Sequence, residues 1–192
     1  MTAAESTLDD KELVAAIAAG DEKSLSELFD RYAGMLTALA HRILKNQPDA
    51  EEVLQETFLQ VWNQAGRYDA KRSSVSTWLV LIARSRAIDR LRTRQVKQRT
   101  AAAAQQENPV QHTSPKGVAN VLRLERRSRL RQELSQLPEE QRRVLEMAFY
   151  GGMTQSEIAE QTGIPLGTVK TRTLLAMKKL RAALQDEIRE LL

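Results

Sequence analysis

The sequence predicts an all-α protein made of two small helical domains that a flexible linker joins. Apolar residues recur every three or four positions along most of the 192-residue chain, which is the period of an amphipathic helix. Aromatic residues make up only 4% of the chain, there are 8 glycines, and no segment shows a strand pattern, so an all-β fold is disfavoured. Periodicity is lost between residues 100 and 120. We therefore expect domains at residues 1–99 and 121–192, with a linker at 100–120.

Two helices are predicted near the N-terminus. Apolar residues at helical spacing run from Leu8 to Ile17 and again from Leu25 to Ile43. Asp21 is expected to cap the second helix, because its carboxylate can accept hydrogen bonds from the first free backbone N–H groups. The run Asn46–Pro48 is expected to end it.

A third helix is expected to open at Asp49, with Glu52 as its capping-box partner, and to stop at Gly66. One side of this helix is apolar, and the opposite side carries carboxylates and amides. A polar loop follows, from Arg67 to Ser74. The next helix, from about Val75 to Arg99, has an apolar first half and a second half rich in arginine.

In the C-terminal part, periodicity resumes at Val121. A helix restarts at Pro138, with proline at its first position and acids in its first turn. Gly151–Gly152 end it, and Thr154 with Glu157 is expected to form the capping box of a further helix.

The segment Gln155–Leu174 has the spacing of a helix-turn-helix. Ala159 lets two helices cross closely, Gly163 turns the chain, and Val169 anchors the second helix to the first. We expect the second helix to expose four side chains that reach phosphates and base edges: Thr168, Lys170, Thr171 and Arg172. Helical hairpins with a purely structural role can share this spacing, so the motif needs support from the rest of the chain.

Charge is distributed unevenly along the chain. Residues 1–70 carry a net charge of −7, residues 71–131 carry +12 and residues 132–192 carry −1, within a total of +4. A basic middle beside an acidic N-terminal part suggests a polyanion as one partner and a basic protein surface as another. Any single charge is also explained by a solvated helix face.

The composition excludes several kinds of site. With no cysteine, the chain has neither disulfides nor cysteine-ligated zinc, which fits a reducing cytoplasm. The two histidines, His41 and His112, lie far apart in sequence, so we expect no metal site and no histidine-based catalysis, although sites built from carboxylates alone stay open. We also expect no cofactor. No apolar run is long enough to span a membrane and the N-terminus does not look like a signal peptide, so we expect a cytoplasmic protein without a membrane partner.

Four motifs occur in order along the chain: Asp49–Trp62, then Thr77–Leu79 with Ile82–Leu91, then Leu137–Arg142, then Ile158–Arg172. Together they resemble the minimal two-domain sigma factors of bacteria, the extracytoplasmic-function group of the sigma-70 family. The resemblance runs from about residue 13 to residue 184, with only the linker unmatched. It implies a subunit that is not an enzyme, binds core RNA polymerase and directs it to promoters through −35 and −10 elements.

The resemblance implies that residues from about 25 to 99 form the promoter-melting domain, called region 2. Within it, the helix Asp49–Trp62 would dock on the clamp helices of the polymerase β′ subunit. The residues expected at that contact are Asp49, Glu52, Gln55, Glu56 and Gln60. A solvated helix face remains the alternative interpretation of each of them.

The loop Arg67–Ser74 and the helix after it would recognise the −10 element, and the loop would take up a base flipped from the non-template strand. A polar, basic loop with one aromatic residue, Tyr68, suits this task because single-stranded bases are held by stacking and phosphate contacts. Trp78 is expected in the core instead. Ser85 stands where many relatives carry asparagine, which puts the preferred base in doubt. The residues expected at the −10 DNA are Arg67, Tyr68, Lys71, Arg72, Ser73, Arg84, Ser85, Arg86, Arg90 and Arg94. The arginines of the helix from about Val75 to Arg99 are expected to neutralise phosphates.

The C-terminal domain, region 4, would place the helix from about Pro165 in the major groove of the −35 element and would dock on the β flap through its other faces. Arg172 and Lys170 are the expected DNA contacts, with the two neighbouring threonines beside them. Relatives often carry arginines where this chain has Leu175 and Met177. Fewer phosphate contacts, or a contact with protein, are expected there.

Two other functions stay open at this point. A conventional helix-turn-helix regulator that binds duplex DNA as a dimer would not need the N-terminal half, which has a polymerase-docking pattern and no evident dimerisation coiled coil. A protein-interaction module without DNA contact fits poorly with the +12 of the middle segment. The resemblance also implies an anti-sigma factor as a negative regulator.

Overall fold

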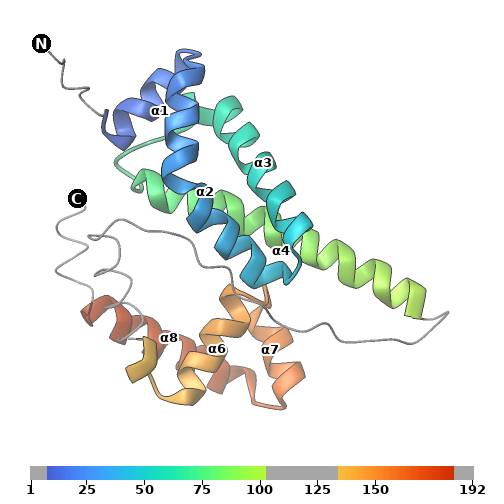
Figure 1. The fold of residues 1–192 in the computed structure, drawn as a ribbon. Helices are drawn as coiled ribbons and strands as arrows, with labels where there is room; N and C mark the ends of the chain where they lie inside the picture. Colours follow the sequence, from blue (N-terminus) through green and yellow to red (C-terminus); the bar gives the residue numbers. More distant parts are fainter. Residues whose placement is uncertain (1–7, 103–133, 184–192) are drawn as a thin grey trace, which may run out of the picture. The chain divides into compact units, whose positions relative to one another are not determined.

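The computed structural model describes residues 8–102 and 134–183, and within these ranges it is helical, with no β-strand (Figure 1). The predicted all-α fold is therefore confirmed. The chain divides into two compact units, one that holds α1 to α4 and one that holds α6 to α8. The predicted linker at residues 100–120 lies outside the described residues, apart from the end of α4, and so does the periodicity predicted from Val121.

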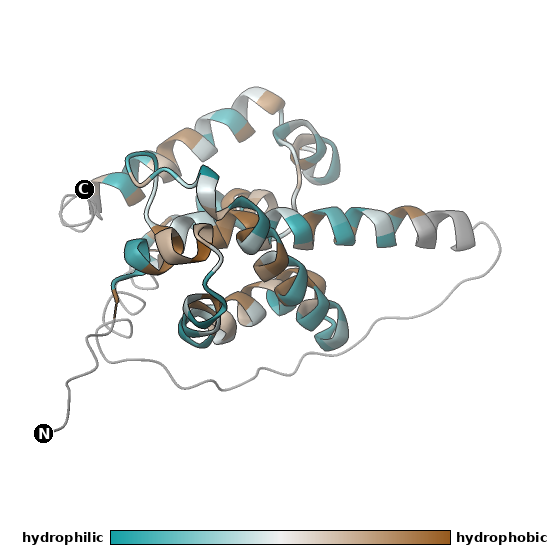
Figure 2. Ribbon diagram, turned by 90° about the horizontal axis from the view of Figure 1, so that it is seen from above, coloured by the Kyte–Doolittle hydropathy of each residue, from teal (hydrophilic) through white to brown (hydrophobic). Residues whose placement is uncertain are grey.

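The first unit is a four-helix cluster. Its elements are α1 (Asp10–Ala18), α2 (Glu22–Leu44), α3 (Gln47–Gln64), the short 3-10 helix η1 (Ala65–Arg67) and α4 (Val75–Ala102). Hydrophobic and hydrophilic residues alternate along the helices, as the amphipathic pattern predicts (Figure 2). Leu13, Leu28, Val61 and Leu79, one from each α-helix, are fully buried in the shared core.

Polar side chains fix the start of the first two helices. Asp9 and Glu12 form a capping box at α1, and the Asp21 carboxylate accepts from the backbone N–H groups of Lys23 and Ser24, which confirms the predicted cap of α2. The Arg31 guanidinium of α2 then donates to the Asp10 carboxylate of α1 at 2.8 Å. This ion pair holds the short first helix against the second.

The third helix begins earlier than predicted. Its N-cap is Asn46, whose side-chain oxygen accepts from the backbone N–H of Asp49 at 2.9 Å. Pro48 lies in the first turn, where its missing N–H costs no hydrogen bond. The predicted capping box of Asp49 and Glu52 was therefore wrong, and both carboxylates are available for contacts outside α3.

The second unit contains the helix-turn-helix. Its elements are α6 (Glu139–Phe149), α7 (Gln155–Thr162) and α8 (Leu166–Ala183), and Pro138 is the N-cap of α6 rather than its first residue. The predicted capping box is confirmed: Glu157 N–H donates to the Thr154 hydroxyl at 3.2 Å, and Thr154 N–H donates to the Glu157 carboxylate at 2.6 Å.

Gly163 and Val169 have the predicted roles. Gly163 has φ +69°, a left-handed conformation that a residue with a Cβ adopts only at a cost, and it separates α7 from α8. Val169 and Ile158 are fully buried and pack with Val144 of α6. The three helices thus share one small apolar core.

Candidate functional site

The polar face of α3 consists of two parallel rows. Glu52, Gln55, Leu59 and Asn63 recur at three- or four-residue spacing and are all exposed. Asp49, Glu56 and Gln60 form the second row, are half-buried and lie beside α4. The five residues predicted as one partner-binding face therefore belong to two surfaces with different surroundings.

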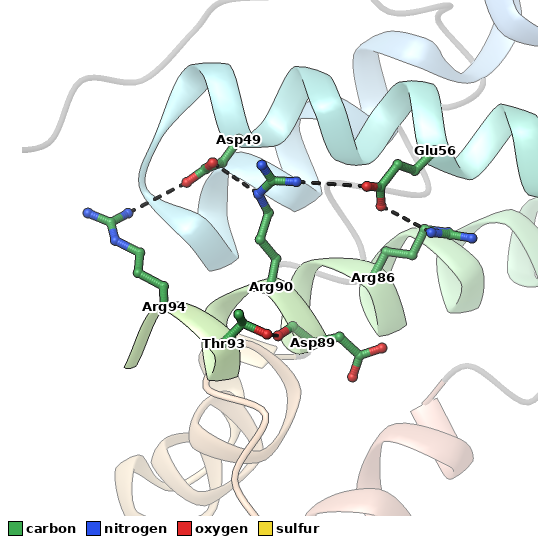
Figure 3. A pocket seen from close by; sticks show the side chains of 7 residues that line it. All are labelled: Asp49, Glu56, Arg86, Asp89, Arg90, Thr93 and Arg94. Carbon is green, nitrogen blue, oxygen red and sulfur yellow. Dashed lines mark hydrogen bonds and ion pairs between the residues drawn. The ribbon is translucent and has the colours of Figure 1, made fainter. Parts of the chain in front are cut away.

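Three arginines of α4 meet the second row of α3, and we call this set of ion pairs the arginine ladder (Figure 3). The Arg86 guanidinium donates to the Gln60 amide oxygen at 2.9 Å and to the Glu56 carboxylate at 3.0 Å. Arg90 donates to the Asp49 carboxylate at 3.0 Å. The spacing of four residues along α4 places these side chains on one side of that helix.

Arg90 is the centre of the ladder. Besides Asp49 it hydrogen-bonds the Glu52 carboxylate, and its Nη1 lies 3.8 Å from the nearer Glu56 oxygen. The hydrogen bond to Glu52 first, and then the hydrogen bond to Asp49, raise the pKa of Arg90 above its ordinary value against the opposing effect of burial. Arg94 adds an ion pair to Asp49 at 3.7 Å.

The ladder brings together residues that the sequence assigned to different partners. Asp49, Glu52, Glu56 and Gln60 were predicted to contact a protein, and Arg86, Arg90 and Arg94 were predicted to contact DNA. In the structure the two groups bind each other across α3 and α4. The remaining predicted residues of α4 lie elsewhere on that helix: Ser85 is exposed and Arg84 is half-buried.

The loop between η1 and α4 is closed by its own side chains. The Tyr68 hydroxyl donates to the backbone oxygen of Ser73 at 2.8 Å, and the Tyr68 ring packs on Trp78 with centroids 5.1 Å apart. Burial, and then the negative charge of Asp10, raise the pKa of Tyr68. Trp78 packs against the core, as predicted. Tyr68 thus links the loop to itself through its hydroxyl group and to the core through its ring.

The cations of that loop are directed outward. Arg67, Lys71 and Arg72 are exposed, whereas Ser73 is half-buried. The Asp69 carboxylate accepts from the backbone N–H of Lys71 at 2.9 Å, which fixes the tip as an Asx turn. The loop therefore presents three positive charges on a backbone held by hydrogen bonds.

The helix-turn-helix exposes a different set of side chains from the predicted one. Lys170 and Thr171 are exposed on α8, as expected, but Thr168 and Arg172 are half-buried. Arg172 lies three residues after buried Val169, which turns it toward the core side of α8, where it pairs with Glu140 of α6 at 2.5 Å. The expectation that Arg172 points outward was therefore wrong.

The exposed face of α8 is longer than predicted and mixes cations with large apolar side chains. Met177 keeps 54% of its surface exposed and Leu174 keeps 68%, and both lie on the same side as Lys170 by helical spacing. Lys178 and Arg181 extend this face and are also exposed. The sequence signal for these two cations was present, because Lys178 lies eight residues and Arg181 eleven residues after Lys170, but the predicted DNA contacts ended at Arg172.

Leu59 was also missed. It keeps 63% of its surface exposed in the middle of α3, although α3 has an extensive apolar side of its own. A helical wheel places it between Gln55 and Asn63, away from buried Val61. A single exposed leucine is common on protein surfaces, but this one lies in the same row as Glu52 and Gln55, which were predicted to contact a partner.

Within the described residues, no group of His, Asp and Glu side chains is arranged to hold a metal ion. The helices in these ranges are also too short or too polar to cross a membrane.

Two family models match the chain: Sigma-70 region 2 over residues 28–96 and Sigma-70, region 4 over residues 127–180. The ECF RNA polymerase sigma factor RpoE of Cereibacter sphaeroides is 36% identical over 163 residues, which cover 84% of this chain and 86% of that protein. The ECF RNA polymerase sigma factor SigK of Mycobacterium sp. (strain KMS) is 30% identical over 181 residues, with coverages of 93% and 92%.

Among solved structures, Rhodobacter sphaeroides SigE in complex with the anti-sigma ChrR is similar over 91% of this chain and 97% of that one, at 31% identity and a TM-score of 0.47. The matches to both sigma-70 regions, and the similarity to the two relatives over most of both chains, assign the protein to a family. The chain belongs to the extracytoplasmic-function (ECF) group of the sigma-70 family of RNA polymerase sigma factors.

Proposed function

We infer that the chain is an alternative sigma factor, which binds core RNA polymerase and directs it to promoters that carry its own −35 and −10 elements. The observation that carries this function is that one chain matches both sigma-70 regions, and each match covers a compact helical unit with an exposed, chemically mixed helix face. A conventional helix-turn-helix regulator is not favoured, because it would leave the sigma-70 region 2 match without a role.

We propose that core polymerase docks on the exposed row of α3, with Glu52 and Gln55 beside Leu59. Leu59 supplies apolar area at the centre of this row, and the polar neighbours supply hydrogen bonds at its margin, which is the usual anatomy of a protein interface. Asp49, Glu56 and Gln60 lie beside this row and hold α4 in the free protein. We propose the β′ clamp helices as the partner, as family membership implies.

The −10 element would be bound by the outward cations of the loop, Arg67, Lys71 and Arg72. Single-stranded DNA is held by positive charge along its backbone together with aromatic stacking. Because the Tyr68 hydroxyl is bound within the loop, we propose that Tyr68 shapes the pocket for a flipped base and offers it one ring edge. Ser73 and Ser85 would supply hydroxyl groups to that base or its phosphate.

The −35 element would be bound by the exposed face of α8. Lys170 and Thr171 lie near the N-terminal end of this helix, where a recognition helix meets base edges and phosphates. Thr168 would assist from its half-buried position. Arg172 would position α8 on α6 through Glu140 and would contact DNA only if that ion pair opens. The exposed apolar residues Leu174 and Met177 would meet protein, with the polymerase β flap as the proposed partner.

The chain would act in the cytoplasm, where its polymerase is, and would carry no catalytic centre, since nucleotide addition belongs to the polymerase. We also propose an anti-sigma factor as its regulator, as family membership implies. A screen for proteins that bind this chain and block its binding to core polymerase tests that proposal, and the absence of any such protein would count against it.

Run-off transcription tests the proposed function. Purified core RNA polymerase of the same organism is incubated with genomic fragments, with and without the protein. Discrete transcripts that require the protein are expected, and their start sites define its −35 and −10 sequences. If the protein forms no complex with core polymerase and yields no new transcript, a duplex-binding regulator becomes the better interpretation.

A further inference from the structure

The arginine ladder places three guanidinium groups of α4 against three carboxylates of α3. Arg86, Arg90 and Arg94 are each paired to Asp49, Glu52 or Glu56, and a groove of about 470 Å³ lies along the pairs. The local net charge of these six groups is therefore close to zero. Because each guanidinium already lies beside a carboxylate, these arginines attract DNA phosphates less strongly than unpaired arginines would.

One carboxylate belongs to both surfaces of α3. Glu52 pairs with Arg90 in the ladder, yet it is exposed in the same row as Gln55 and Leu59, with 54% of its side chain accessible. A cationic partner that docks on the exposed row meets Glu52 first. If it takes that carboxylate, Arg90 loses one of its hydrogen-bonded partners and the ladder weakens from its centre.

We propose that the ladder is a charge latch: Asp49, Glu52 and Glu56 hold the arginines of α4 away from nucleic acid until a cationic surface docks on α3. The latch rests on the proposed function, because that function supplies both the docking partner and the DNA. It makes Glu52 and Glu56 positioning residues, which act on DNA binding through Arg86 and Arg90. By thermodynamic linkage, DNA that binds the freed arginines strengthens polymerase docking by the same factor.

The latch is tested on the free protein with a fluorescein-labelled oligothymidylate single strand, followed by fluorescence anisotropy. In the double variant Asp49→Asn, Glu56→Gln, each arginine of the ladder loses a charged partner. We expect about tenfold tighter binding than in the unchanged protein, which corresponds to about 1.4 kcal/mol. The logarithm of the binding constant should also fall more steeply with the logarithm of salt concentration, by about 0.7 for each freed arginine.

A matched control separates the latch from a simple gain of positive charge. Asp30→Asn with Glu51→Gln changes the net charge by the same amount, on exposed positions of α2 and α3 that are outside the ladder. This control should leave the salt slope unchanged. In the Asp49→Asn, Glu56→Gln background, adding Arg86→Ala and Arg90→Ala should abolish the gain in affinity.

Equal gains in the ladder variant and the control, or a gain that survives removal of the arginines, would overturn the latch. Thermal unfolding by circular dichroism verifies that the variants fold. If the double variant does not fold, Glu56→Gln alone leaves Arg90 with Asp49 and Glu52 and should give a smaller gain of the same kind.

A second measurement uses the complex with core polymerase. There docking has weakened the latch in the unchanged protein, so the difference in affinity between the ladder variant and the unchanged protein should shrink well below tenfold. A tenfold difference that persists in the complex would contradict release by docking. Absence of the complex itself would refute the proposed function, whereas the free-protein titration would still decide whether the ladder masks the arginines.

Discussion

Replacing Leu59 by alanine tests where polymerase docks on this protein. A fully buried leucine contributes about 1.5–3 kcal/mol. Because Leu59 keeps 63% of its surface exposed, only about a third of that amount stabilises the free fold, which is about 0.5–1 kcal/mol. The substitution should therefore leave the protein folded, with a small decrease in its melting temperature.

Docking would bury the exposed part of the same side chain. If core polymerase covers the remaining surface of Leu59, the leucine contributes about 1–2 kcal/mol to binding. Its loss should then weaken the complex by about 5- to 30-fold in Kd. Titration of the fluorescently labelled protein with purified core polymerase, followed by anisotropy, measures this change directly.

Leu81 provides the matched control for this experiment. It is also an exposed leucine, with 56% of its surface accessible, but it lies on α4 rather than in the exposed row of α3. Leu81→Ala should leave the Kd for core polymerase within about twofold of the unchanged protein. The same Kd for Leu59→Ala and the unchanged protein, or equal losses in the two variants, would refute docking through the exposed row of α3.

Three further predictions concern the helix-turn-helix and a helix cap. Lys170→Ala should reduce transcription from promoters that need a −35 element. Arg172→Ala should mainly lower the melting temperature, by the equivalent of about 0.2–1 kcal/mol, because it removes the ion pair with Glu140. A defect of Arg172→Ala in transcription alone, with an unchanged melting temperature, would contradict that pairing. Gly163→Ala should destabilise the C-terminal unit by about 1 kcal/mol, because φ is +69°, even though an added Cβ would meet no atom there. Gly163→Asn should cause a smaller loss of stability. Equal melting temperatures for the two variants would argue against a left-handed turn. The pKa of Asp21 is lowered, first of all by the hydrogen bond from the Ser24 side chain. The ionised Asp21 cap therefore stabilises the fold fully above the ordinary pKa of 3.8, and this stabilisation is lost as the pH falls through the lowered pKa of the folded protein. The difference in melting temperature between the unchanged protein and Asp21→Asn should shrink between about pH 6 and about pH 3, and a constant difference would refute the charged cap.

The sequence was sufficient to predict which helices form and to which family the chain belongs, but not the first residue of α3. Helical periodicity, the cap at Asp21 and the Thr154–Glu157 box depend on residues a few positions apart, so local physics fixes them. The same holds for the Gly163 turn, because only the residue's own backbone angle matters there. The sigma-70 motifs are likewise linear patterns, and both matched the family models.

Side-chain partners across helices could not be derived in this way. Arg90 and Asp49 are 41 residues apart, and their pairing depends on the angle and register at which α3 and α4 pack. The sequence showed an acidic helix and a basic helix and assigned each to an outside partner. Packing decided that the half-buried row of each binds the other, and that Leu59 stays outside the core.

The same distinction applies to the recognition helix. Its position in the chain and its buried anchor Val169 followed from spacing alone. That Arg172 turns toward Glu140 of α6, while Lys170 remains exposed, depended on where α6 lies against α8. Local sequence thus determined which helices form and to which family the chain belongs. Tertiary packing determined which charges are neutralised within the protein and which remain available to a partner. The reason is that a charge is neutralised by the opposite charges that lie within a few ångströms of it, whatever their position in the sequence.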